Sequence, residues 1–174
     1  MPPADHSTID SPLALKHVMK LMGIVGKSGQ ESKVADYVTR ALLKGGAQAS
    51  FIESDAAHRR SPNGGERGNL VMKLPGTRRG PRRMLSAHLD TVPICVGSQP
   101  KRKGNLVKSA DPTTGLGADN RAGTAVLLTT ALHLLRHRVP HPPLTFCWFV
   151  QEEVGLLGAR HVSKGLLGRP KLAF

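Results

Sequence analysis

The chain has 174 residues, of which 39% are hydrophobic and 21% charged, a composition that suits one folded domain and excludes an intrinsically disordered protein. The first residues lack a basic segment followed by an apolar one, and no apolar run approaches the roughly 18 residues of a membrane span. We therefore expect neither secretion nor membrane insertion. The two cysteines, Cys95 and Cys147, lack the spacing of a disulfide framework or a zinc finger, which favours a reducing cytoplasm.

The formal net charge of +13 is the unusual feature of the composition. Eight of the 25 Lys and Arg residues lie between Arg59 and Arg83, where Glu66 is the only acid, and a second basic cluster spans 101–108. Such basicity is typical of proteins that bind nucleic acid. Only 3% of the residues are aromatic, however, and single-stranded nucleic acid is normally bound on aromatic side chains. A basic nucleic-acid-binding module is therefore the less favoured alternative.

Hydrophobic periodicity predicts helices and strands in mixed order. Apolar residues recur at helical spacing in two N-terminal segments, and Gly45-Gly46 ends the second. A long helix rich in Ala and Leu follows Asp119-Asn120, and the run LTFCWFV is typical of a strand buried on both faces. The predicted helices cover 12–22, 31–43 and 124–135, the predicted strands cover 47–53, 69–74, 83–87 and 144–150, and 58–68 is predicted to be a polar loop. This pattern predicts an α/β fold, with a mixed sheet flanked by helices, in one domain over 1–174.

Acidic residues are concentrated where these strands and loops end. Four of the five acids after Met84 lie in three loops: Asp90 in the first, Asp119 in the second, and Glu152 and Glu153 in the third. The loops at the carboxyl ends of strands form the crevice in which α/β sheets bind ligands. An oxygen-rich site for hard or borderline cations accounts for this concentration.

Each loop also has a simpler interpretation. His88 and Asp90 are two apart on an extended chain and point to the same side, which suits either a metal-binding histidine oriented by a carboxylate or a surface pair. Asp119 precedes a helix and suits either a bridging metal ligand or an N-terminal cap. Glu152 and Glu153 are adjacent carboxylates, which repel each other unless cations or solvent neutralise them.

Three motifs, HLDTV, GLGADNRAG and QEEVGLLGA, resemble in this order and spacing the di-zinc exopeptidase superfamily of peptidase T, aminoacylase-1 and carboxypeptidase G2. The stretches SADPTTGLGAD and VQEEVGLLGAR are most similar to the tripeptide aminopeptidase branch. The resemblance implies that His88 binds one Zn2+ ion, that Asp119 bridges two and that Glu153 binds the other. It implies two catalytic residues, Asp90 to orient His88 and Glu152 as the general base. The implied function is a zinc-dependent aminopeptidase that acts on short peptides.

The same resemblance implies parts that this sequence does not supply. Family members carry a further aspartate ligand after the paired glutamates, a last histidine ligand, and a lid or dimerisation domain between them. Each zinc would therefore have two protein ligands here instead of about three. We expect an incomplete metallopeptidase catalytic domain over 1–174, with low or no activity alone, and a homodimer only if the missing domain is supplied.

Other residues and functions remain as alternatives. His133 and His137 lie one helical turn apart, as a metal pair would, but we interpret them as the polar face of a helix. The last residues, 171–174, have the pattern of the start of the strand that would carry the missing aspartate. A related deacylase or carboxypeptidase uses the same metal loops, and an inactive binding fragment is the other alternative.

Overall fold

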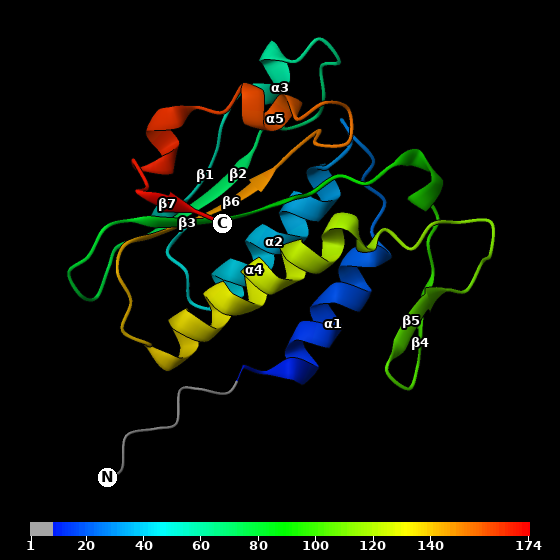
Figure 1. Ribbon diagram of the computed structural model, residues 1–174, viewed down its shortest axis with the longest axis horizontal. Helices are drawn as coiled ribbons and strands as arrows, with labels where there is room; N and C mark the ends of the chain where they lie inside the picture. The colour runs from blue at the N-terminus through cyan, green and yellow to red at the C-terminus, as the bar shows by residue number, and fades with distance from the viewer. Residues whose placement is uncertain (1–8) are drawn as a thin grey trace.

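The structure is a computed structural model that describes residues 9–174, and its elements are shown in Figure 1. The first eight residues, which bear on the expectation about secretion, lie outside the described residues. The helices are α1 (Ser11–Met22), α2 (Ser32–Lys44), η1 (Ala49–Phe51), α3 (Ala57–Arg60), η2 (Pro93–Cys95), α4 (Ala118–His137), α5 (Leu157–Arg160) and η3 (Lys164–Leu167). The strands are β1 (Ile52–Ser54), β2 (Leu70–Leu74), β3 (Arg83–His88), β4 (Pro100–Lys103), β5 (Leu106–Ser109), β6 (Leu144–Phe149) and β7 (Leu172–Ala173).

Five strands form one mixed sheet in the order β1-β2-β6-β3-β7. β1 and β2 are antiparallel, as are β2 and β6, whereas β6 and β3 are parallel and so are β3 and β7. The parallel pair is in register from Arg83 opposite Leu144 to His88 opposite Phe149. The carboxyl ends of β3 and β6 therefore meet at one edge of the sheet. The predicted α/β class, with a mixed sheet flanked by helices, is confirmed.

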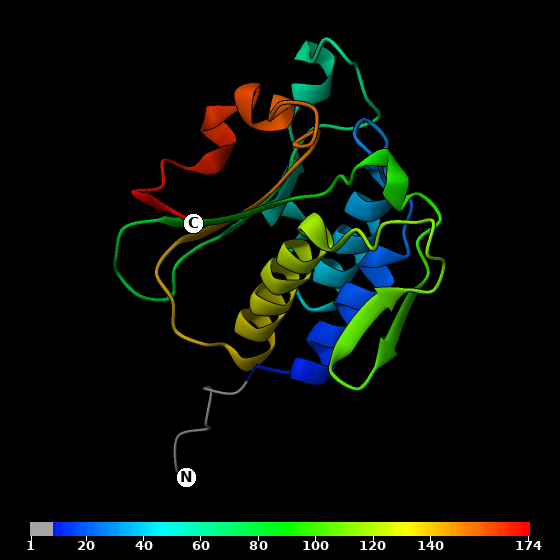
Figure 2. The same ribbon diagram turned by 45° about the vertical axis from the view of Figure 1, so that its right-hand side comes forward.

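Helices cover the two faces of the sheet unequally. α1, α2 and α4 lie on one face, and the shorter α3, α5 and η3 lie toward the other (Figures 1 and 2). The main core fills the first interface and includes Val38 of α2, Leu128 of α4 and Trp148 of β6, all fully buried. A smaller cluster of Val71, Met84 and Cys147 lies on the second face and packs against η3. β6 is therefore apolar on both sides, as its continuous hydrophobic run predicts.

Two boundaries differ from the predictions. The segment predicted as a strand over 47–53 begins with the turn of η1, in which Phe51 N donates to Gln48 O, and only then enters β1. The predicted polar loop over 58–68 begins inside α3, whose first residue, Ala57, donates its N–H to Oδ1 of Asp55. Both errors come from single turns fixed by local hydrogen bonds, which hydrophobic periodicity does not encode. The other predicted helices and strands are present, although α4 begins six residues earlier than the predicted 124.

The basic stretch 101–108 forms most of a hairpin that was not predicted. β4 and β5 pair from Pro100 opposite Ser109 to Lys103 opposite Leu106, and they stand beside α1, apart from the main sheet (Figure 2). The side chains of this hairpin are largely exposed. Its strands therefore lack the alternation of buried apolar and exposed polar residues that identifies a half-buried strand in a sequence.

The C-terminal residues extend the main sheet. The strand that the sequence pattern predicts at the end of the chain is present as β7, which pairs in parallel with β3 so that Leu172 lies opposite Arg83. Among residues 9–174, none of the helices is both long enough and apolar enough to cross a bilayer.

Candidate metal centre

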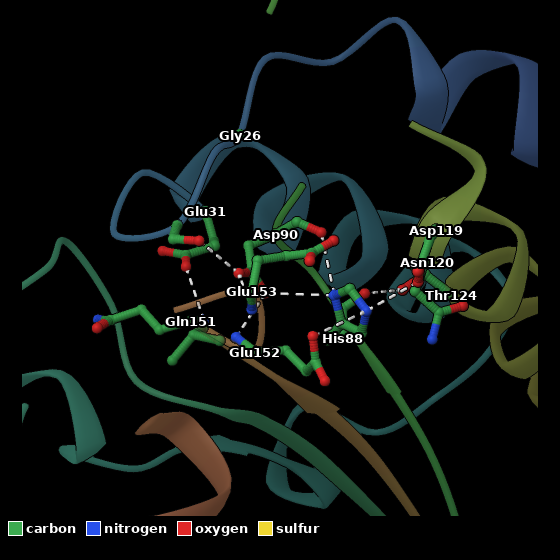
Figure 3. A network of polar contacts seen from close by, with 12 residues as sticks. Gly26, Glu31, His88, Asp90, Asp119, Asn120, Thr124, Gln151, Glu152 and Glu153 are labelled. Carbon is green, nitrogen blue, oxygen red and sulfur yellow. Dashed lines mark hydrogen bonds and ion pairs between the residues drawn. The ribbon is translucent and has the colours of Figure 1, made fainter. Parts of the chain in front are cut away.

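His88 is the last residue of β3 and lies at the sheet edge where β3 and β6 end (Figure 3). Its backbone is fixed on the helical side, because Thr124 Oγ1 of α4 donates to His88 O at 2.9 Å. The side chain is 8% exposed. The imidazole is therefore held in one position by packing and presents its Nε2 edge to the neighbouring loops.

Asp90 lies beneath the imidazole and is completely buried. Its Oδ1 is 3.3 Å from His88 Nδ1, and its backbone oxygen is 3.1 Å from the same nitrogen. Burial by itself raises the pKa of Asp90, but hydrogen bonds from His88, Ser28 and the backbone N–H groups of the 152–153 turn lower it further than burial raises it. Asp90 is thus an ionised carboxylate that fixes the orientation of His88 with Nε2 turned outward, the arrangement found behind metal-binding histidines.

Asp119 approaches His88 from the start of α4. Its Oδ1 lies 3.1 Å from His88 Nε2, although 83% of the Asp119 side chain is exposed. The peptide bond between Asp119 and Asn120 is cis. Asp119 and Asn120 have non-helical backbone angles at a kink in the first turn of α4, and beyond it Asn120 Oδ1 accepts the N–H of Gly123 at 2.9 Å. The Asp119 side chain faces His88 instead of capping the helix.

Glu152 and Glu153 follow β6 in a turn whose backbone is hydrogen-bonded to Asp90. Glu152 N donates to Asp90 Oδ1 at 3.0 Å and Glu153 N donates to Asp90 Oδ2 at 3.1 Å. Glu152 Oε2 is 3.7 Å from His88 Nε2, and its side chain is 36% exposed. The turn therefore directs both glutamates toward the same imidazole edge that Asp119 faces.

Ligand atoms of His88, Asp119 and Glu153 all lie within 4.8 Å of one another, and this is the one group of three or more His, Cys, Asp or Glu donors found in the described part of the chain. Negative charge accumulates here. Partial burial and then the carboxylates of Asp119, Asp90 and Glu152 raise the pKa of Glu153, while His88 opposes the shift. Burial lowers the pKa of His88, but the surrounding carboxylates outweigh it and raise that pKa above its ordinary value.

These residues fit a metal ion. One imidazole and two carboxylates are a donor set that divalent cations accept, and the clustered carboxylates repel one another until positive charge offsets them. The imidazole already has the buried carboxylate partner that such a ligand requires. The structure thus brings together all five residues that the sequence indicated, from three separate loops.

Residues 69–172 match the family model described as peptidase family M28. The chain belongs to this family. The span contains all five residues of the cluster and most of the sheet.

This M28 family member is similar to several known proteins. It is 34% identical over 100 residues to the uncharacterized protein YqjE of Bacillus subtilis, covering 58% of this chain and 27% of YqjE. A tripeptidase from Staphylococcus aureus is 28% identical with a TM-score of 0.84, and aminopeptidase PepT from Bacillus cereus is 27% identical with a TM-score of 0.83. Each covers 95% of this chain, and the chain covers 43% of each. The resemblance to peptidase T-type enzymes is confirmed, and the chain spans about a third of the length of the curated relatives it matches.

Two histidines that the sequence suggested as an alternative metal pair lie elsewhere in the M28 family member. The rings of His133 and His137 on α4 are 4.7 Å apart between centroids and tilted by 39°. Within residues 9–174, the group of donors that could hold a metal ion includes neither of them.

Sequence reasoning missed two buried polar residues beside the cluster. Glu31, before α2, accepts the backbone N–H of Gln151 at 3.0 Å, and the Gln151 side chain accepts from Ser61 Oγ at 2.7 Å. Glu31 is fully buried and Gln151 is 1% exposed. Glu31 belongs to a segment with a clear helical pattern, so nothing local distinguishes it from an ordinary first-turn acid. Its contact is visible only when the fold brings residues 31 and 151 together.

Proposed function

We propose that the chain forms the zinc-binding part of a peptide hydrolase that acts as an aminopeptidase on short peptides. The observation that carries this proposal is the convergence of His88, Asp119 and Glu153, with Asp90 buried beneath the imidazole. Membership of family M28 and the likeness to a tripeptidase and to aminopeptidase PepT support the same reaction class.

The proposed ligands are His88, Asp119 and Glu153, and Asp119 would be shared between two zinc ions. Bound zinc would polarise the peptide carbonyl and make water more acidic. Asp90 holds the His88 ring through Nδ1, so that Nε2, which faces Asp119 Oδ1 at 3.1 Å, would bind the metal once it has lost its proton. A bound cation would offset the repulsion among the clustered carboxylates, which favours metal binding at this site.

Glu152 is the proposed general base. Asp90 accepts the backbone N–H of Glu152. The Glu152 carboxylate is partly exposed beside His88 Nε2. It can therefore take a proton from the attacking water and return it to the nitrogen of the leaving amine. Glu153, the next residue, has its N–H on the other oxygen of Asp90. Asp90 thus sets the relative placement of the proposed base and the proposed ligand.

The cytoplasm remains the proposed compartment. Cys95 and Cys147 are both free thiols in the structure, and Cys147 is buried in the smaller core cluster. Burial raises the pKa of the Cys147 thiol well above its ordinary value, so this cysteine is an inert core residue.

Zinc titration by calorimetry tests the proposal. We expect saturable binding by the 174-residue chain and its loss in a His88→Ala, Asp119→Ala double variant of unchanged secondary structure. Zinc should also raise the melting temperature of the wild type but not of the double variant, because a ligand that binds only the folded state stabilises it. Equal binding by the two proteins, or none by the wild type, would reject the metal assignment.

Hydrolysis assays distinguish the reaction classes that share these loops. A tripeptide with a free amino group, an N-acyl amino acid and a C-terminal carboxypeptidase substrate should be compared with and without zinc. Faster zinc-dependent cleavage of the tripeptide, lost in Glu152→Gln, supports the aminopeptidase. Preferential cleavage of the N-acyl amino acid or the carboxypeptidase substrate would replace it with the corresponding alternative.

A further inference from the structure

The loop between α1 and α2, residues 23–31, supplies no proposed ligand, yet it contacts all three segments that do. Gly26 O accepts the N–H of Thr91 at 3.2 Å, just after the His88 segment. The same oxygen accepts from Arg121 Nη2 at 3.0 Å, just after Asp119. Glu31 Oε1 accepts the N–H of Gln151 at 3.0 Å, just before the two glutamates. Figure 3 shows Gly26 and Glu31 on this loop beside the cluster.

Two buried carboxylates receive three consecutive N–H groups of the turn after β6. Glu31 accepts from Gln151, and Asp90 accepts from Glu152 and from Glu153. Glu31 and Asp90 come from different segments, so the turn is held by two parts of the chain. The turn needs such support because Gln151 has a φ of 54°, in the left-handed region that residues other than glycine rarely adopt.

The side chain of Gln151 completes the anchorage. It accepts from Ser61 Oγ at 2.7 Å and donates through Nε2 to Gly64 O at 2.6 Å. With its amide on Glu31, this residue is held at both its backbone and its side chain. The direction in which the chain leaves Gln151 sets where the next two side chains, the proposed base and the proposed ligand, can reach.

The burial of Glu31 carries a cost in folding free energy. Glu31 is fully buried, and among the described residues its Oε2 has no hydrogen-bond partner. Oε1 accepts from Gly29 N at 2.8 Å as well as from Gln151 N. A buried carboxylate with one oxygen unpaired destabilises a fold unless its other contacts compensate. A residue that served packing alone would be better replaced by an apolar side chain of similar shape.

We propose that Glu31 is a positioning residue of the metal centre, which acts by holding the Gln151 amide and thereby the placement of Glu152 and Glu153. This inference rests on the proposed function for its consequence in metal binding. Its structural step, the fixing of the turn, concerns only contacts within the protein and is measurable without a metal.

Amide exchange followed by NMR, in a chelator to keep the protein metal-free, tests the structural step. Glu31→Met has a similar length but no acceptor, whereas Glu31→Gln retains one oxygen for the Gln151 N–H. We expect exchange at the Gln151 amide to be at least roughly tenfold faster in Glu31→Met, because the side-chain acceptor of its hydrogen bond is removed. Glu31→Gln should restore most of the protection. If Glu31→Met does not fold, Glu31→Asp, whose shorter side chain draws the acceptor away, should show the same acceleration.

Val38→Ala is the matched control for general destabilisation. It opens a cavity at a fully buried α2 residue of the main hydrophobic core. Its Gln151 amide should be accelerated no more than the amides in the middle of β6. Unchanged Gln151 exchange in Glu31→Met, or an acceleration matched by Val38→Ala at equal loss of melting temperature, would overturn the proposal.

Zinc affinity then tests the consequence at the site. Glu31→Met should bind zinc at least roughly tenfold more weakly than the wild type, a size typical of losing a residue that supports a ligand. Glu31→Gln should recover most of this affinity, and Val38→Ala should lose little. Wild-type affinity in Glu31→Met would refute a positioning role at the metal centre. Absence of binding by the wild type would reject the proposed function instead, while the exchange result still decides whether Glu31 holds the turn.

Discussion

Nε2 of His88 lies 3.1 Å from Oδ1 of Asp119, although the two residues are 31 positions apart in sequence. One partner is buried and the other is exposed: the His88 side chain is 8% exposed and the Asp119 side chain 83%. Because Asp119 is exposed, its carboxylate can adjust to a metal ion at His88 without repacking of the core. The affinity of such a centre should depend most strongly on its buried member.

The first prediction concerns that buried member. His88→Ala should weaken zinc binding by at least roughly a hundredfold, more than the loss of a supporting residue does. The matched control is His161→Ala, which removes an imidazole outside the described donor group. Calorimetric titration of both variants measures the difference. Similar zinc affinity in the two variants would show that the metal, if bound, uses another site.

The second prediction concerns Asp90. Asp90→Asn replaces a carboxylate oxygen by an NH2 group, which cannot accept the backbone N–H groups of both Glu152 and Glu153. We expect a loss of about 2–4 kcal/mol in the free energy of unfolding, because a buried donor is left unpaired. Urea unfolding at pH 7 in a chelator measures it.

The control for Asp90 is Asp36→Asn. Asp36 pairs with Arg67 on the surface, where 48% of its side chain is exposed. Loss of such a pair should cost about 0–1 kcal/mol. If Asp90→Asn is no more destabilising than Asp36→Asn, the four contacts to the Asp90 carboxylate contribute little to stability.

How far the sequence predicted this arrangement depends on the range of the interactions. β6 was predictable because its residues from Leu144 to Trp148 are apolar except for Thr145, as expected of a strand that is buried on both faces. The acidic loops were predictable as a group because strands end at a common sheet edge, where their loops converge. Both inferences need only a local pattern and a general rule of topology.

The remaining features depend on contacts that no local pattern encodes. The β4–β5 hairpin is rich in lysine, and none of its residues is fully buried, so no apolar face identifies it in the sequence. Glu31 has the sequence context of a helix start, and only the packing of the α1–α2 loop against Gln151 makes it a buried acceptor. At the kink in the first turn of α4, Asn120 rather than Asp119 accepts a backbone N–H of the helix, a difference that depends on the backbone geometry of adjacent residues.

The third prediction concerns pH. Burial raises the pKa of Glu31 from 4.5 to about 7, so the folded protein holds this proton more tightly than the unfolded chain does. The stability from this protonation is fully present below about pH 4.5 and is lost as the pH rises through 7. Glu31→Gln does not titrate. Relative to the wild type it should therefore gain about 2–3 kcal/mol of unfolding free energy between pH 5 and pH 8.

Urea unfolding of both proteins at several pH values in a chelator measures this difference. Glu66→Gln, which removes an exposed carboxylate, is the control, and its difference from the wild type should vary by no more than about 0.5 kcal/mol over the same range. A constant difference between Glu31→Gln and the wild type would mean that Glu31 stays ionised in the folded protein throughout this range.

The last prediction concerns the packing of α5 against the end of β6. A Cβ at Gly158 would lie 2.2 Å from Val150 O and 2.5 Å from Asn69 Oδ1, whereas a Cβ at Gly165 would meet nothing within 4 Å. Asn69 bridges the two segments, since its Oδ1 accepts from Val150 N and its Nδ2 donates to Gly158 O. Gly158→Ala must break this bridge or move the backbone, and it should cost about 2–3 kcal/mol of stability.

Gly165→Ala should change stability by no more than about 0.5 kcal/mol and serves as the matched control. Because Val150 immediately precedes Gln151, the Gly158 variant should also weaken zinc binding, whereas the Gly165 variant should not. Thermal unfolding and zinc titration of both variants check these outcomes. Loss of stability in Gly158→Ala with full zinc affinity would show that the turn after β6 is held by Glu31 and Asp90 independently of the α5 packing beneath it.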